Sequence, residues 1–215
     1  MGKQTKNNRK KEQRFDPFML VDIALHVCIA YLFFQIWATP SESDVDKIYA
    51  LTTLILFEFI MVHSGILMAA FPPKFSIFIF FPFYGLFAWC FNQLVPDNSI
   101  MYLYLGVVLN RMRFAFFNAD KETKRQNILW SVYACSIYIV LFLSVHVLSG
   151  KVPELGLTPD FLDRAAYSPS GIGAMYNEPK IAMCIGMLYY IMLALFNVAM
   201  FGISLKNLVK RITKQ

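Results

Sequence analysis

Long, nearly uninterrupted apolar runs are the feature that most constrains how this chain can fold. A helix needs about 20 mostly apolar residues to cross the hydrocarbon layer of a bilayer, which is about 30 Å thick. The runs of this length lie near Pro17–Thr39, Ile48–Phe71, Phe75–Val95, Ile100–Phe117, Ile128–Leu148 and Ile181–Leu205. They are continuous rather than alternating, which favours helices over the strands of a membrane barrel. We therefore predict an all-α, polytopic integral membrane bundle with six transmembrane helices.

The composition supports the same class of protein. Hydrophobic residues make up 57% of the 215 residues and charged residues only 16%, whereas soluble domains average about 45–50% and about 25%. One soluble domain of this size could not hide so much apolar surface in its own core. The composition excludes an ordinary soluble enzyme, a disordered chain and a disulfide-stapled secreted module.

Polar or proline-containing breaks separate the apolar runs and define the organisation of the chain. We predict a basic tail over residues 1–16, a six-span domain over 17–205 that includes a long loop at 149–180, and a second basic tail over 206–215. Within the loop, the segment Thr158–Asp163 predicts the start of a short amphipathic helix. Pro82 predicts a kink in the third span. Trp37, Trp89 and Trp130 lie near span ends, as residues of an interfacial aromatic belt do.

The basic residues predict the orientation. If the N-terminus is cytoplasmic, sixteen of the twenty lysines and arginines lie on or toward the cytoplasmic side, and such a bias marks the inner face of membrane proteins. We therefore expect both termini in the cytoplasm, in a plasma or inner membrane. The basic tails would then lie beside anionic lipid. A protein partner or a homo-oligomer also stays open, but no nucleic acid is expected, because the basic tail has no interleaved aromatic residues.

Polar residues within the apolar runs are the candidate functional residues. A charge at the bilayer centre costs about 2.5–3.5 kcal/mol on insertion scales, so such residues are expected to face the bundle interior and find partners. The predicted intramembrane polar site consists of Asp22, His26, Glu58, His63, Asn110, Arg111 and Arg113. At 1.5 Å per residue, Glu58 lies near the midplane and the other charged residues and histidines lie in one layer of the cytoplasmic half.

Helical spacing relates some of these residues to one another. Asp22 and His26 are four apart and share a helix face. Glu58 and His63 are five apart, about 140° around the helix, and do not share a face. Arg111 and Arg113 are two apart and point in different directions, so we expect one of them to reach the bundle interior.

This polar layer has three interpretations. The leading one is a non-enzymatic membrane protein that binds a partner or permeant through the layer, with ion pairs between the carboxylates and arginines that fix helix packing. The first alternative is a proton- or ion-coupled transporter or channel. The second is a metal-dependent intramembrane enzyme, for which His26, His63 and Glu58 are weak candidate ligands. No catalytic motif such as HExxH supports an enzyme, and the sequence identifies no cofactor.

The four cysteines carry no metal or redox signature. Cys28, Cys90, Cys135 and Cys184 fall in four different spans, without a CxxC or a Cys/His zinc spacing. A cysteine in a helix behaves as a small apolar residue, so we expect these four to contribute to packing.

Overall fold

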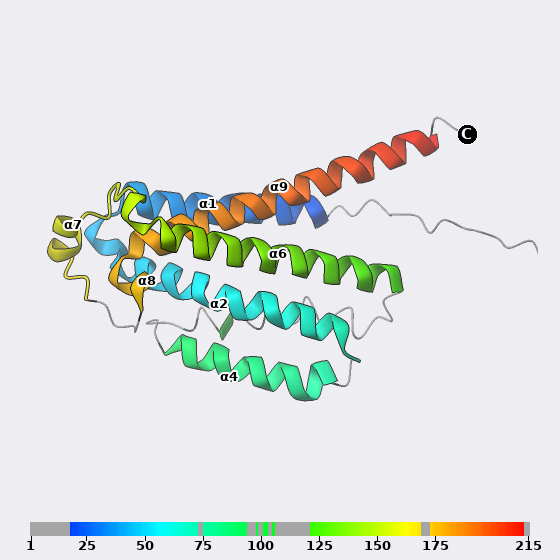
Figure 1. The fold of residues 1–215 in the computed structure, drawn as a ribbon, viewed down its shortest axis with the longest axis horizontal. Coiled ribbons are helices and arrows are strands. Elements are labelled where there is room, and N and C mark those ends of the chain that lie inside the picture. Colours follow the sequence, from blue (N-terminus) through cyan, green and yellow to red (C-terminus); the bar gives the residue numbers. More distant parts are fainter. Residues whose placement is uncertain are drawn as a thin grey trace, which may run out of the picture.

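The computed structural model describes residues 18–72, 75–93, 98, 101, 102, 105, 121–168 and 173–212, and every regular element in these residues is helical (Figure 1). The long helices are α1 (Phe18–Ala38), α2 (Val45–Ala70), α4 (Phe81–Asn92), α6 (Lys121–Val147) and α9 (Pro179–Ile212). The short ones are η1 (Glu42–Asp44), η2 (Ser76–Phe80), η3 (Ser149–Lys151), α7 (Pro159–Arg164) and α8 (Ala174–Asn177). The predicted all-α fold is therefore confirmed for the described residues.

Three of the described helices are long and apolar enough to cross a membrane. Their apolar segments are Leu20–Ala38 in α1, Ile128–Val147 in α6 and Pro179–Gly202 in α9. These segments contain 19, 20 and 24 residues, or about 29 to 36 Å of helix. α2 has 26 residues, which corresponds to about 39 Å. The described part of the chain thus has the features of a helical membrane protein.

Helix α9 is the centre of the arrangement. It packs most extensively on α1 and also contacts α2 and α6, while α4 lies against α2 on the far side (Figure 1). Figure 1 also shows the start of α1 and the end of α9 at the same end of the bundle, which we call the terminal end. The connections after α1 and after α6 lie at the opposite end, which we call the loop end.

Two helices are longer than the spans predicted for them. α6 begins at Lys121 rather than near Ile128, and α9 continues to Ile212, past the predicted end at Leu205. The added residues are mostly Lys, Glu, Arg, Gln, Leu and Ile, of which all but Ile are strong helix formers. A helix does not have to end where its apolar segment ends, so the hydropathy pattern located the apolar segments but not the helix ends.

The predicted third span is irregular at the place where its proline lies. A π-helical turn, η2, directly precedes α4, and Pro82 occupies the first turn of α4. Proline lacks a backbone donor and disturbs the turn before it, and π-helical turns are a recognised form of such a disturbance. This agrees with the predicted kink. Of the predicted fourth span, Ile100–Phe117, only Met101, Tyr102 and Leu105 are among the described residues.

The described residues of the long loop form a cap at the loop end. The predicted amphipathic helix is confirmed as α7, whose N-cap Thr158 accepts a hydrogen bond from the backbone N–H of Phe161. Phe161 is buried in the main core. Tyr167 donates to the carbonyl of Tyr176 over 2.9 Å, and burial raises the pKa of Tyr167 so that it stays a neutral donor. The cap is therefore part of the folded bundle.

Trp37 attaches the cap to α1. Its indole N–H donates to the carbonyl of Pro153 over 3.0 Å, and its own carbonyl accepts from the N–H of Gly156 over 3.0 Å. Trp37 is buried, so its assignment to an interfacial belt is wrong, whereas the exposed Trp89 fits that assignment. A tryptophan whose N–H finds a carbonyl can be buried without an unsatisfied donor.

The turn between α1 and α2 is held by Asp44. Its carboxylate accepts from the Ser41 hydroxyl over 2.6 Å, from the Ser41 N–H over 2.9 Å, and from Lys47 Nζ over 2.6 Å. The Lys47 ammonium and then the two Ser41 donors lower the pKa of Asp44 to about 2. A lowered carboxyl pKa stabilises the fold above the ordinary carboxyl pKa and loses that effect as the pH falls toward about 2.

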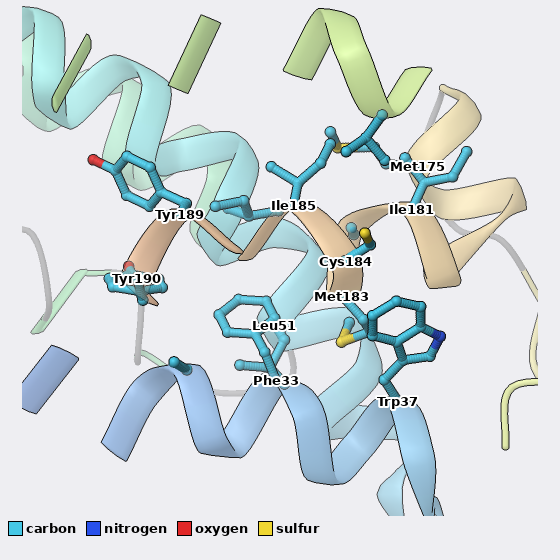
Figure 2. Packing of buried hydrophobic residues seen from close by; sticks show 14 of the residues in the cluster. Phe33, Trp37, Leu51, Met175, Ile181, Met183, Cys184, Ile185, Tyr189 and Tyr190 are labelled. Carbon is cyan, nitrogen blue, oxygen red and sulfur yellow. The ribbon is translucent and has the colours of Figure 1, made fainter. Parts of the chain in front are cut away.

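The contact between α1 and α9 is unusually close at Gly186. A Cβ atom at this position would lie 2.3 Å from a ring carbon of Phe33. Phe33 is fully buried and stacks on Tyr190. Figure 2 shows Phe33 and Trp37 pointing from α1 toward the core residues of α9. Glycine allows helix backbones to approach closely in membrane proteins, and here it admits the whole Phe33 ring.

We predict that Gly186→Ala lowers the stability of the bundle by about 1–3 kcal/mol, because the added methyl group displaces a ring that has no free space around it. Gly202→Ala on the same helix is the matched control, since a Cβ there meets nothing within 4 Å; it should be neutral or stabilise by up to about 1 kcal/mol. Thermal melting of both variants in detergent measures the difference. Equal melting temperatures for the two variants would contradict the close contact.

Candidate functional site

Glu58 of α2 lies against α6 and α9, where its described neighbours include three phenols. Tyr189 of α9 donates its hydroxyl hydrogen bond to Glu58 Oε1 over 3.0 Å. Tyr138 of α6 and Tyr190 of α9 lie within electrostatic range of the same carboxyl group. The Tyr189 ring packs edge-on against both of these tyrosines, with centroid distances of 5.7 and 5.2 Å. We call Glu58 and these three tyrosines the Glu58 cluster.

The three tyrosines are buried and come from two helices. Tyr138, Tyr189 and Tyr190 are each at most 5% exposed. Figure 2 shows Tyr189 and Tyr190 leaving adjacent positions of α9 in different directions. Tyr138 uses its hydroxyl to donate to the backbone carbonyl of Ile55 on α2 over 2.9 Å. A buried phenol without a partner would destabilise the fold, so these bonds also hold α6 and α9 against α2.

His26 of α1 lies beside the cluster and connects it to the terminal end. Its Nδ1 donates to the carbonyl of Asp22 over 2.6 Å, and its ring lies 6.0 Å from that of Tyr190. The side-chain amide of Asn197 on α9 is 3.5 Å from the same ring nitrogen. Asn197 in turn accepts from the indole N–H of Trp130 on α6 over 3.3 Å. Polar groups from three helices therefore meet next to Tyr190.

His63 faces a different helix. Its Nδ1 donates to the carbonyl of Phe59 over 2.7 Å, and its Nε2 lies 3.6 Å from the thiol of Cys135 on α6. The expected separation of Glu58 and His63 around α2 agrees with these contacts, because Glu58 bonds to α9 and His63 contacts α6.

The structure brings some of the predicted site residues together and not others. Glu58 is bound by Tyr189, and His26 lies beside Tyr190 of the same cluster. His63 instead contacts Cys135 of α6. Asp22 is exposed and shares the expected helix face with His26 through its carbonyl; its place in the polar site stays a prediction. Asn110, Arg111 and Arg113 lie outside the described residues, and their expected pairing with the carboxylates stays a prediction.

The proposed metal ligands do not form a site. In the described part of the chain, no three His, Cys, Asp or Glu side chains lie where they could hold a metal ion together. His26, His63 and Glu58 all belong to that part: His26 and Glu58 contact different residues of α9, and His63 contacts α6. The geometry therefore does not favour the metal-dependent alternative.

Tyr138, Tyr189, Tyr190 and Asn197 are the site residues that the sequence reasoning missed. A charged residue in an apolar run stands out by its cost in a membrane, whereas tyrosine and asparagine carry no charge and do not. A signal was available, because Tyr189 lies about 12 Å from the loop-end side of the last span and Glu58 about 15 Å from that side of the second. Similar depth on two helices that run in the same direction indicates residues that can meet.

Comparison of the chain with protein-family models, with curated proteins and with solved structures finds no match.

We predict that Tyr189→Phe lowers the stability by about 1–3 kcal/mol, because it removes a donor to Glu58 in a buried position. Tyr133→Phe is the matched control on α6, where the ring stacks on Phe196 at 3.9 Å; we expect a change within about 0.5 kcal/mol. Chemical or thermal unfolding in detergent compares the two. A Tyr189 variant as stable as the Tyr133 variant would show that the bond to Glu58 contributes nothing.

Proposed function

We propose that the chain is a non-enzymatic membrane protein with six transmembrane helices, and that its intramembrane polar layer binds a permeant at Glu58. The observation that carries this proposal is the position of Glu58 between α2, α6 and α9, with Tyr189 donating to it. Intramembrane carboxyl groups are costly, and those that are present commonly mark ion and proton pathways. A carboxylate accepts protons and cations, and phenols can exchange the hydrogen bonds around it.

A proton or a small cation is the permeant class that this chemistry favours. The described neighbours of Glu58 offer hydroxyl groups and aromatic rings, and both interact favourably with a cation that approaches a carboxylate. His26 adds an imidazole, which can both accept and donate a proton, beside Tyr190. The row of His26, Tyr190 and Glu58 therefore supports proton-coupled permeation as the form of the proposal.

The six-span topology rests on hydropathy and charge. The common end of α1 and α9 (Figure 1) supports an even number of spans, and the excess of basic residues in both tails supports a cytoplasmic position for that end. The tails would then lie against anionic lipid of the inner leaflet. Helix α9 continues to Ile212, which would present its last basic residues at this surface.

The topology predicts which engineered cysteines an impermeant maleimide reaches. Ser43→Cys at the loop end should be labelled on intact cells, whereas Asn7→Cys and Gln215→Cys should be labelled only after permeabilisation. The unmodified protein is the control for its own four cysteines. Labelling of either terminal variant on intact cells would contradict the cytoplasmic position of that terminus.

The proton pathway predicts a pH change in proteoliposomes that depends on Glu58. The purified protein, reconstituted with a pH-sensitive dye inside the vesicles, should dissipate an imposed pH gradient faster than empty vesicles do. Glu58→Gln should reduce this rate to the level of empty vesicles, because the amide cannot take up a proton. Glu42→Gln, an exposed carboxyl in η1, should leave the rate unchanged. A Glu58→Gln rate equal to that of the unmodified protein would overturn the role of Glu58.

A further inference from the structure

A thiol and an imidazole face each other across α2 and α6. The Cys135 sulfur lies 3.6 Å from Nε2 of His63. His63 Nδ1 is 2.7 Å from the carbonyl of Phe59, and a carbonyl can only accept, so Nδ1 carries the ring proton. Nε2 is then unprotonated in the neutral ring, and the Cys135 thiol donates to it. This is the arrangement in which a histidine can take the proton of a nucleophilic thiol.

The other cysteines do not share this arrangement. Among the hydrogen bonds of the described residues, only the thiol of Cys135 meets a histidine. Cys28 and Cys90 are exposed on helix surfaces, and Cys184 is buried in the main core. The chain therefore contains three internal comparisons for the chemistry of Cys135.

An apolar groove runs along the same two helices. It encloses about 460 Å³ and is lined by Leu56, Phe59, Tyr138, Ile139, Phe142 and Leu143. A smaller cavity of about 140 Å³ shares Leu56 and Phe142 with it and extends to His146 and the α8 segment at the loop end. The two spaces lie next to each other along α2 and α6 and share two walls; we call them together the α2–α6 seam.

The seam lies next to the thiol–imidazole pair. The Phe59 ring, which lines the groove, packs edge-on against the His63 ring at 4.2 Å. Cys135 lies one helical turn before Ile139, another lining residue. Along α6, the distance from Cys135 to Phe142 is about 10 Å and to His146 about 16 Å. An extended apolar chain that starts at Cys135 therefore has an apolar path along most of the span.

We propose that Cys135 is an S-acylation site and that a long-chain acyl group attached to it lies in the α2–α6 seam. A thiol beside a base explains where the acyl group is attached, and the seam explains where its chain goes. The Cys135 side chain is 8% exposed and His63 is half-buried, so the pair is shielded from water but not closed. The inference does not depend on proton permeation at Glu58.

The acyl donor in this reaction is a long-chain acyl thioester of coenzyme A. His63 Nε2 takes the proton of the Cys135 thiol, and the sulfur attacks the carbonyl carbon of the thioester. A new carbon–sulfur bond to Cys135 forms, and the carbon–sulfur bond to coenzyme A breaks. The proton held by His63 passes to the leaving coenzyme A thiolate. Nothing is oxidised or reduced.

The test is acylation of the purified full-length protein with palmitoyl coenzyme A, followed by intact-mass measurement. We expect one added acyl group, which neutral hydroxylamine removes because it is a thioester. Cys135→Ser should abolish the hydroxylamine-sensitive acyl group, whereas Cys28→Ala, Cys90→Ala and Cys184→Ala should keep it. No acylation, acylation that persists in Cys135→Ser, or bound lipid that resists hydroxylamine would overturn the proposal.

Two further variants separate the base and the seam from effects on folding. His63→Gln should slow acylation at least about 100-fold, as expected for the loss of a general base. Ile139→Trp should fill the groove and reduce acylation at least about tenfold, while methyl methanethiosulfonate, a small reagent, still modifies Cys135. Acylation at the original rate in His63→Gln would overturn the role of the histidine, and an unchanged rate in Ile139→Trp would overturn the position of the chain.

Discussion

The close contact between α1 and α9 is the interaction on which the rest of the bundle depends. At Gly186 the absence of a side chain leaves room for the Phe33 ring, and this contact determines how α9 is rotated about its own axis. With that rotation, the next turn of α9 directs Tyr189 toward Glu58 and Tyr190 toward His26. The position of the polar groups is thus a consequence of an apolar contact. In lipid, the hydrophobic effect does not drive helices together, so close packing determines how they associate.

A second constraint explains why phenols lie beside Glu58 in the described part of the chain. In hydrocarbon, a polar group has to find its partner within the protein. Tyr189 supplies a donor while the remainder of its ring contributes apolar packing, which an arginine or lysine does less well. Tyr138 meets the same constraint by donating to the carbonyl of Ile55. Buried tyrosines can therefore satisfy a carboxyl group without adding a second charge to the core.

The parts of the fold that depend on local sequence could be predicted, and the parts that depend on helix packing could not. Continuous apolar runs predicted the long helices of the described residues, and the N-cap Thr158 and the helix disturbance at Pro82 follow from the chemistry of those residues. The exposure of Asp22 and the burial of Trp37 depend on which neighbour each helix face meets. Hydropathy does not identify the neighbour of a helix face, because an apolar face can lie against lipid as well as against another helix.

The same limit applies to the candidate site. Glu58, His26 and His63 could be selected from the sequence because ionisable groups are costly in a membrane. Their partners could not be selected in this way. Two adjacent tyrosines in an apolar helix are common, and only the depth and rotation of α9 show that they meet Glu58 and His26. Likewise, the pairing of Cys135 with His63 joins residues 72 positions apart, and no spacing motif in the sequence relates them.

Tyr138 connects the two sites. Its ring forms part of the apolar groove, its hydroxyl binds the backbone of α2 at Ile55, and it lies within electrostatic range of Glu58. A chain in the α2–α6 seam would therefore contact the same side chain that holds α6 against α2 beside the carboxyl group. A chain that displaces this ring would also move the hydroxyl bound to Ile55 and change the distance of the phenol from Glu58. Occupation of the seam and the surroundings of Glu58 are, for that reason, physically coupled through one residue.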